Sequence, residues 1–325
     1  MLEVYLFILL ILIVSLTIDL TYGELPTKIH PVVIIGMIIN FFKKIFISIN
    51  NKWSGFLTTL FTMLFSSLIL IILLIIVSFN DFINTIVSSV ILSSTYSIKM
   101  LISTANDIKQ DLSEDVEKAK KSVSYLVSRN TDELTEEFIV SATIESMTEN
   151  ITDSFIAPIF YFAIISIVFI YFNLNNYYFI LILVPFIYRI SNTLDAMLGY
   201  KTDELINIGF FPAKLDDILN YIPSRISCLF IIISAFILRY DGKNAYKITK
   251  RDANNCPSPN SGYTMAPTAG ALNIQLIKKD TYVLGDNTVE INVNHITKAI
   301  KLTSLTIGLF TIFTFILIII VYMII

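Results

Sequence analysis

Charged side chains are scarce in this sequence of 325 residues. Asp, Glu, Lys and Arg make up 15% of the chain and hydrophobic residues 55%, whereas roughly a quarter of a soluble domain is charged. The ranges Phe56–Phe79 and Thr303–Ile325 carry no charge at all. A run of about 20 such residues can cross a hydrocarbon core roughly 30 Å thick. The sequence therefore predicts a polytopic membrane protein rather than a soluble one.

Cysteine and histidine are also rare, with two of each. The cysteines form no CxxC pair and cannot build a disulfide framework, and His30 and His295 are far apart, which argues against a histidine-rich metal site. The net charge of −3 provides no basic excess for phosphates along a duplex, so we expect no nucleic-acid partner. Walker A, GxGxxG, HExxH and GxSxG patterns are absent, so serine-hydrolase and zinc-protease chemistry are not supported.

Apolar runs and basic loops together predict the topology. The loops 19–55, 104–156, 191–225 and 239–302 carry nearly all the lysines and arginines, which favour the cytoplasmic side. Six crossings with the N-terminus outside satisfy this rule if the short run 226–238 does not cross. The six predicted spans are 2–18, 56–79, 82–103, 157–172, 177–190 and 303–325. We expect a multi-pass protein of the plasma membrane, in contact with lipid.

The predicted fold class is an all-α polytopic membrane protein with about six transmembrane helices. Interfacial or re-entrant helices are expected at 32–42 and 226–238, which are too short to span. Leu272–Leu276 and Thr288–Val293 alternate polar and apolar residues, which is typical of a small β-ribbon near the C-terminus. The predicted organisation is one integral-membrane domain (1–325), with a cytoplasmic helical insertion (104–156), a cytoplasmic loop with the ribbon (239–302) and a C-terminal membrane helix (303–325).

The insertion should begin with a soluble helix. Leu112, Val116, Ala119 and Val123 recur at spacings of three and four, which forms one apolar stripe. Acidic residues precede lysines along this helix, an order that complements the helix dipole.

Three carboxylates follow one another just before a membrane segment. Glu145, Glu149 and Asp153 are spaced i, i+4, i+8, so on a helix they share one stripe and repel one another. Desolvation near the membrane increases this repulsion, and arginines, protons or a hard divalent cation could relieve it. Asn150 could add an amide oxygen, and Mg²⁺ prefers such ligands. The alternative is an acidic helix face in water.

Other polar groups cluster outside the apolar runs. His30, before Pro31, could be a base or a ligand, or a hydrogen-bonded structural residue. The stretch Arg251–Gly270 is rich in Pro and Gly, so we expect an irregular loop whose backbone could hold an anion or which merely connects helices. A third group could mark function, because polar groups beside a membrane are costly, or could form Asp–Arg pairs: Asn192, Asp195, Asp216, Asp217, Asn220 and Arg225.

These stretches resemble the cobalamin-biosynthesis family called CbiB or CobD, adenosylcobinamide-phosphate synthase. The motifs follow in the family's order over nearly the whole chain. Three positions depart from the family pattern: Ser128 begins SRNT where GRDT is usual, Ser154 replaces a glycine, and Cys256 replaces a histidine. The motifs are Leu20–Pro31, Arg129–Tyr161 (RNTDELTEEFIVSATIESMTENITDSFIAPIFY), Asn192–Tyr200 (NTLDAMLGY), Ala213–Arg225 (AKLDDILNYIPSR) and Arg251–Leu272, followed by TYVLGD.

The resemblance implies an ATP-dependent carbon–nitrogen ligase. The family joins the carboxylate of adenosylcobyric acid, a corrinoid, to aminopropanol O-phosphate, and an acyl phosphate is the expected intermediate. Mg²⁺ and the co-substrate ATP are implied, with the active site on the cytoplasmic face. The sequence leaves open whether the amine donor is aminopropanol phosphate or ethanolamine phosphate. Association with later cobalamin-assembly enzymes is a further expectation.

The implied site residues fall into three groups. The catalytic group contains a base, carboxylates and a cationic clamp, the metal group contains oxygen ligands, and the substrate-binding group contains polar side chains and a loop. The catalytic residues are His30, Glu149, Asp153, Arg129 and Asp217. The metal ligands are Glu145, Glu149, Asn150 and Asp153. The substrate-binding residues are Asn192, Asp195, Asp216, Asn220, Arg225, Arg251, Asp252, Ser258, Asn260 and Gly262.

Two other functions compete with the ligase. A cation-coupled transporter would use carboxylates near spans, but the acidic residues lie outside the apolar cores and no internal repeat is visible. A non-enzymatic membrane sensor or scaffold, similar to the AmpE-type proteins, is the second. The acidic stretch and the Asp-Asp-x-x-Asn pattern favour the enzyme.

Overall fold

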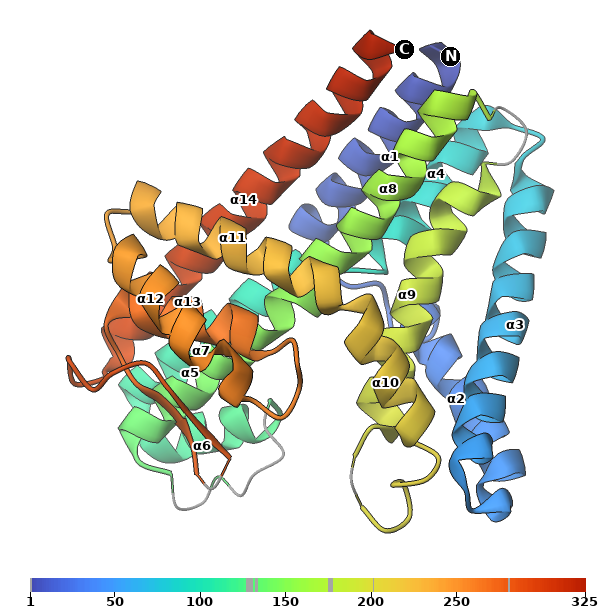
Figure 1. Ribbon diagram of the computed structural model, residues 1–325. Coiled ribbons are helices and arrows are strands. Elements are labelled where there is room, and N and C mark those ends of the chain that lie inside the picture. The colour runs from blue at the N-terminus through green and yellow to red at the C-terminus, as the bar shows by residue number, and fades with distance from the viewer. Residues whose placement is uncertain (1, 127–130, 132–133, 175–177, 201, 280) are drawn as a thin grey trace. The chain divides into compact units, whose positions relative to one another are not determined.

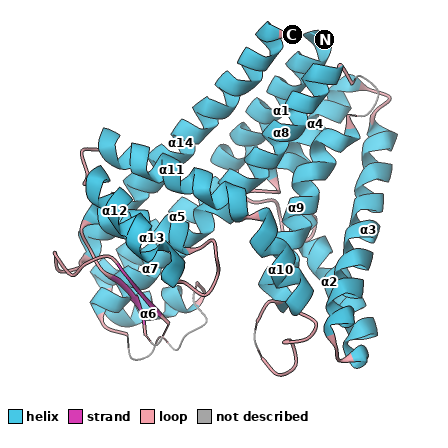
Figure 2. Ribbon diagram, viewed as in Figure 1, coloured by secondary structure: helices cyan, strands magenta, loops and turns pink. Residues whose placement is uncertain are grey.

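The computed structural model describes the chain except residues 1, 127–130, 132–133, 175–177, 201 and 280. Helices dominate, and one two-stranded antiparallel sheet lies near the C-terminus (Figures 1 and 2). The predicted fold class is thereby confirmed. The chain divides into two compact units, the first formed by 1–98, 157–219 and 314–325, and the second by 99–156 and 220–313.

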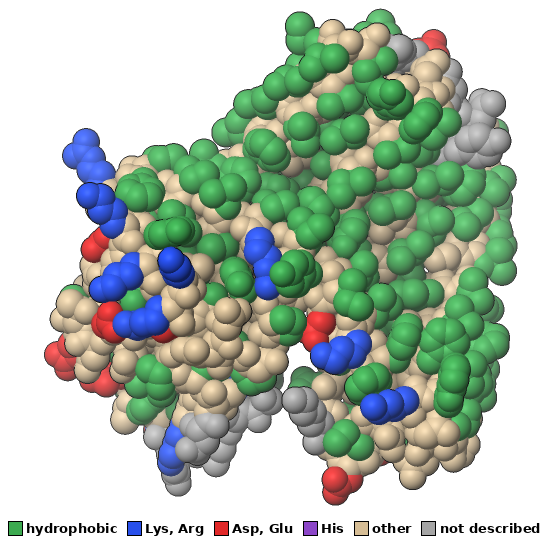
Figure 3. Space-filling view, in the orientation of Figure 1, with side chains coloured by type: hydrophobic (Ala, Val, Ile, Leu, Met, Phe, Trp, Pro, Cys, Tyr) green, Lys and Arg blue, Asp and Glu red, His purple; other side chains and the backbone are tan. Residues whose placement is uncertain are grey.

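The first unit is built from long apolar helices. The helix α1 packs on α4, α2 on α3, α3 on α9, and α8 on α9. Large hydrophobic side chains remain exposed along α3, as the space-filling view shows (Figure 3), which is what a lipid-facing helix requires. The helices of this unit are α1 (Leu2–Thr21), α2 (Pro31–Phe46), α3 (Lys52–Val77), α4 (Asp81–Ser93), α8 (Ala157–Phe172), α9 (Phe179–Leu198) and α10 (Phe210–Leu219).

Seven helical stretches of the described chain are long and apolar enough to cross a membrane. One more than predicted qualifies because α2 continues into the 3-10 turn η1 (Ile47–Ile49), so that Pro31–Ile49 reaches 19 residues. The run 226–238 lies in α11, which passes the same test together with α10 as a bent pair, a broken span or a re-entrant loop. The chain is therefore a multi-pass membrane protein, and six crossings stay a prediction.

The second unit surrounds a buried helix, α13 (Gly262–Leu272), of which only Tyr263 is not buried. Most of its residues are small, so α11, α12 and α7 can pack closely against it. The other elements are α5 (Ile98–Glu114), α6 (Val116–Ser124), α7 (Glu136–Ile151), η2 (Thr152–Ile156), α11 (Tyr221–Ile237), α12 (Gly242–Asp252), η3 (Ala253–Asn255), β1 (Leu276–Lys278), β2 (Tyr282–Leu284) and α14 (Val293–Ile324).

Three local predictions differ from the structure. The amphipathic stretch in the insertion is two helices, because the Asp115 carboxylate accepts the Glu117 amide at 3.0 Å and begins a new helix, α6. The ribbon pairs Leu276 with Leu284 and not the two alternating runs predicted. The expected irregular loop Arg251–Gly270 contains most of α13, with Pro267 inside it, because burial outweighs the one backbone hydrogen bond that proline removes.

Gly285, which follows β2, provides a test of this packing. Its φ is +82°, and an added Cβ would meet the Ile274 carbonyl oxygen and lie 3.0 Å from the Ala269 Cβ. We expect Gly285→Ala to destabilise the protein by roughly 1–3 kcal/mol, measured as a lower unfolding midpoint in detergent. Gly308→Ala is the matched control, because an added Cβ there meets nothing within 4 Å. Equal unfolding midpoints for the two variants would show that close packing around Gly285 does not stabilise the protein.

Candidate functional site

The predicted acidic stripe divides into a buried and an accessible part. Glu145 on α7 is 4% exposed, and its two carboxylate oxygens accept hydrogen bonds from Ser141 and Tyr282, each at 2.7 Å. Burial and the neighbouring Glu145 raise the pKa of Tyr282 well above its usual value, so this phenol remains a donor. Ser141 also accepts the Ile277 amide at 3.3 Å. Glu145 therefore anchors the two-stranded sheet to α7.

Glu149 and Asn150 lie one turn further along α7 and are exposed, while Asp153 is half-buried. Asp153 belongs to η2, a π-helical turn, whose i→i+5 pattern interrupts the regular stripe. In the described residues no three His, Cys, Asp or Glu side chains lie close enough together to hold a metal ion. Mg²⁺ usually takes only one or two carboxylates and completes its shell with water and substrate phosphate. The accessible oxygens fit that kind of site, whereas Glu145 is already engaged.

Arg251 is held by the protein's own carboxylates. Its Nε and Nη2 donate to the two oxygens of Asp252 at 2.6 and 2.8 Å, and its Nη1 donates to Asp286 at 2.8 Å. The Gly285 amide also donates to Asp252 at 2.8 Å. Burial alone would raise the pKa of Asp252, but the hydrogen bonds from Arg251 and Gly285 lower it. This network fixes the turn after β2 to the end of α12.

Arg225 on α11 is also engaged. Its guanidinium lies 3.7 Å from the Tyr221 ring centroid and 3.9 Å from that of Tyr263. It donates to Asn260 Oδ1 at 2.7 Å and to the Pro259 carbonyl at 3.0 Å. A planar guanidinium suits such a stacked site, and a lysine would not replace it. Arg225 thus positions the loop that precedes α13.

Two other predicted residues shape the same loop. The Ser258 hydroxyl accepts the Asn260 amide at 3.2 Å. Gly262 begins α13 where an added Cβ would meet the Ala253 carbonyl oxygen, so close backbone packing accounts for this glycine. The positions of Ser258, Asn260 and Gly262 follow from the loop's own hydrogen bonds and contacts.

The remaining predicted residues lie in the first unit or where the second begins. Asn192 on α9 accepts a hydrogen bond from Arg189 at 3.1 Å, and Asp195 is one turn further along. Asp216 and Asp217 lie on α10, and Lys214 is 3.4 Å from Asp217. Asn220 is the N-cap residue of α11, so the i,i+4 relation of Asp216 to Asn220 does not lie on one continuous helix.

His30 caps a helix. Its Nδ1 accepts the Val32 amide at 3.2 Å at the start of α2, which leaves the proton of a neutral imidazole on Nε2. Burial lowers the pKa of His30, Glu24 opposes this shift, and Arg189 adds to it, so the neutral form is favoured. Nε2 is then a donor, so the geometry does not favour a base role.

The structure thus groups the predicted residues within each unit separately. His30, Asn192, Asp195, Asp216 and Asp217 belong to the first unit, and the acidic stretch, Asn220 and the two arginine networks belong to the second. Arg129 lies outside the described residues. Sequence reasoning missed four partners of the predicted groups. All four stand in motifs that carried the resemblance, which could have pointed to them: Tyr282 and Asp286 in TYVLGD, Tyr221 in Ala213–Arg225 and Tyr263 in Arg251–Leu272.

The Asp252 network should make stability depend on pH. A carboxyl whose pKa is lowered by folding stabilises the protein above its unfolded pKa of roughly 4, and this contribution is lost as pH falls through the folded pKa. We expect Asp252→Asn to lower the free energy of unfolding by about 1–3 kcal/mol at pH 7. The difference from wild type should shrink below pH ~4, as measured by unfolding midpoints across pH.

Asp286→Asn is the matched control. Asp286 binds the same guanidinium but is 45% exposed, whereas the Asp252 side chain is 6% exposed, and exposed ion pairs contribute about 1 kcal/mol or less. If Asp286→Asn lowered the free energy of unfolding as much as Asp252→Asn, the assignment to the buried Asp252 would be wrong. A loss of stability in Asp252→Asn that did not change with pH would also contradict it.

Comparison with known proteins supplies the family. The sequence model described as CobD/Cbib protein matches residues 12–303. A relative from Methanothermobacter thermautotrophicus, a probable cobalamin biosynthesis protein CobD, is 40% identical and covers 93% of this chain and 95% of its own. The corresponding protein of Methanocaldococcus jannaschii is 39% identical over 87% and 90%. A cobalamin biosynthesis protein CobD of Clostridium perfringens is 43% identical over 50% and 46%. No solved structure matches significantly.

Proposed function

The chain belongs to the CobD/Cbib protein family of cobalamin biosynthesis, and we propose that it is the ATP-dependent ligase joining adenosylcobyric acid to aminopropanol O-phosphate. The product is adenosylcobinamide phosphate. The observation that carries the proposal is the family match over residues 12–303, together with the exposed carboxylate of Glu149 at the end of α7. The reaction would take place on the cytoplasmic face of the plasma membrane.

The chemistry requires activation of a carboxylate. Oxygen is a poor leaving group from a carboxylate, so direct attack by an amine is slow. In the proposed path a carboxylate oxygen of the corrinoid attacks the γ-phosphorus of ATP, and ADP leaves. The amine nitrogen then attacks the acyl phosphate, and the C–O bond breaks with loss of inorganic phosphate. One proton leaves the nitrogen, and the balance is one amide, ADP and phosphate.

Glu149 and Asp153, with Asn150, are the residues that would hold Mg²⁺, which when bound would neutralise charge on the transferring phosphoryl group. Support comes from their chemistry and position: Glu149 and Asn150 are exposed at the end of α7, and Asp153 is half-buried in the adjoining turn η2. Glu145 has a different proposed role. Because Ser141 and Tyr282 occupy its oxygens, it would fix the orientation of α7.

The arginines have a positioning role in this proposal. Arg225 and Arg251 already donate to protein oxygens. Arg225 would therefore hold the 256–261 loop, and Arg251 the turn after β2, and neither would bind phosphate directly. For the first unit we propose metal or amine binding by Asp195, Asp216 and Asp217, with Asn192 as a neutral substrate-binding side chain. Their support is the resemblance alone.

A turnover assay on the purified full chain tests the function. The reaction would contain adenosylcobyric acid, ATP, Mg²⁺ and aminopropanol phosphate, and mass spectrometry would identify corrinoid products. We expect the amide to form and to disappear when Mg²⁺ is chelated. A chain that binds the corrinoid but forms no amide would need a partner subunit. Failure of both binding and turnover would refute the ligase and favour a membrane scaffold.

Glu149→Gln tests the proposed carboxylate. The substitution keeps the size of the side chain and removes its charge, so turnover should fall by roughly 100-fold or more while the unfolding midpoint stays near that of wild type. Glu137→Gln is the control, because Glu137 is an exposed residue in the first turn of the same helix and should keep full activity. Wild-type turnover by Glu149→Gln would remove this residue from the site.

A further inference from the structure

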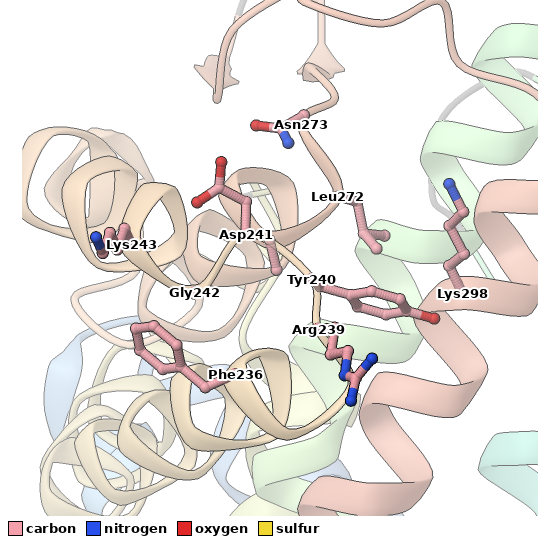
Figure 4. A pocket seen from close by; sticks show the side chains of 10 residues that line it. Phe236, Arg239, Tyr240, Asp241, Gly242, Lys243, Leu272, Asn273 and Lys298 are labelled. Atoms are coloured by element: carbon pink, nitrogen blue, oxygen red, sulfur yellow. The ribbon is translucent and has the colours of Figure 1, made fainter.

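A second polar site is lined by none of the residues assigned to the reaction. A pocket of about 540 Å³ opens in the second unit, lined by the end of α11, the start of α12, the end of α13 and one residue of α14 (Figure 4). Its lining contains three cations, Arg239, Lys243 and Lys298, but only one anion, Asp241.

These cations are not neutralised by neighbours. Within the part of the chain that the structure describes, no ion pair joins any of the three to a carboxylate. The Asp241 carboxylate caps α12 by accepting the Asn244 amide at 2.8 Å. Figure 4 shows Arg239 and Lys298 beside the Tyr240 side chain, while Asp241 and Lys243 lie on its other side. The pocket therefore has a net positive charge and suits an anion.

The backbone at Arg239 is unusual for an arginine. The Tyr240 amide donates to the Ala235 carbonyl and the Arg239 amide to the Phe236 carbonyl, at 2.8 and 3.1 Å. This is the pattern of a helix end that normally uses glycine in the left-handed conformation. Arg239 adopts it with φ of 58°, although a side chain is disfavoured there. Glycine can replace Arg239 without backbone strain, which removes the cation and keeps the turn.

The pocket lies at the polar ends of two apolar helices. Arg239 follows the uncharged run 226–238, and Lys298 precedes the uncharged run that begins at Leu302. The two helices pack together: Thr306 donates to the Ser234 hydroxyl at 3.0 Å, and the Phe230 ring lies 5.5 Å from that of Phe310. Apolar side chains of α11 remain exposed on the run that leads to the pocket: Leu229, Ile233, Phe236 and Ile237.

We propose that this pocket binds the phosphate of an anionic phospholipid. Unpaired Lys and Arg side chains bind phosphate oxygens, and basic pockets between membrane helices are suited to anionic head groups. A soluble phosphate would use the same cations. The exposed apolar surface of α11 favours the lipid, because acyl chains can lie against it while the phosphate occupies the pocket.

Lipid binding to the purified full chain tests the proposal. The chain would be placed in nanodiscs of phosphatidylcholine with or without phosphatidylglycerol, and bound phosphatidylglycerol would be counted by native mass spectrometry after release. The pocket variant combines Arg239→Gly, Lys243→Gln and Lys298→Gln. The matched control, Lys247→Gln with Lys250→Gln and Lys279→Gln, removes the same charge from exposed lysines outside the pocket.

We expect the pocket variant to retain phosphatidylglycerol at least about tenfold less than wild type, because it lacks all three cations that would attract the phosphate, and the control to resemble wild type. Equal retention by the two variants would overturn the proposal. A second experiment adds ATP or inorganic phosphate to the nanodiscs that contain phosphatidylglycerol. Displacement of phosphatidylglycerol by either one, with binding of that anion lost in the pocket variant only, would assign the pocket to a soluble phosphate and overturn the lipid assignment.

Discussion

Close backbone packing of α13 is the constraint on which the second unit depends. Gly270 lies where an added Cβ would be 2.6 Å from the Asn244 carbonyl oxygen of α12, and Gly262 meets the backbone of Ala253. Such separations exclude every side chain, so helices of larger residues could not occupy this place. α13 in turn holds α7, α11 and the sheet. The loop with Ser258 and Asn260 and the turn with Gly285 are therefore fixed by a helix that carries no charge of its own.

The two arginines at either side of the loop before α13 are satisfied by the protein's own groups. Arg251 is matched by Asp252 and Asp286, and Arg225 by neutral oxygens and two aromatic rings. A fork of donors already satisfied by carboxylates has little capacity left for phosphate. Both arginines therefore hold loops of the second unit in place. The charge of Glu145 is likewise shared with hydroxyl donors, whereas Glu149 remains accessible.

Long uncharged runs in the sequence were sufficient to predict the membrane helices that contain them. The runs at 56–79 and 303–325 correspond to α3 and α14, because a lipid-facing helix needs apolar residues all round. The sequence was insufficient where tertiary contacts decided the outcome. The irregular appearance of Arg251–Gly270 gave no sign of α13, since burial and not propensity makes that helix. The i, i+4, i+8 spacing predicted one acidic stripe, but the π turn at Thr152–Ile156 cannot be read from spacing.

The same reasoning explains which site residues could be identified. The resemblance to the family motifs selected Glu145, Glu149 and Asp153 together, because a motif identifies positions and does not give the contacts of each side chain. The contact with Tyr282, 137 residues away in sequence, distinguishes Glu145, whose oxygens accept hydrogen bonds inside the protein, from the exposed Glu149. A buried carboxylate costs free energy unless donors satisfy it, so the hydroxyls around Glu145 are a condition for placing it there. Glu149 lies one turn further along α7 and is exposed, so its position does not require the same set of hydroxyl donors.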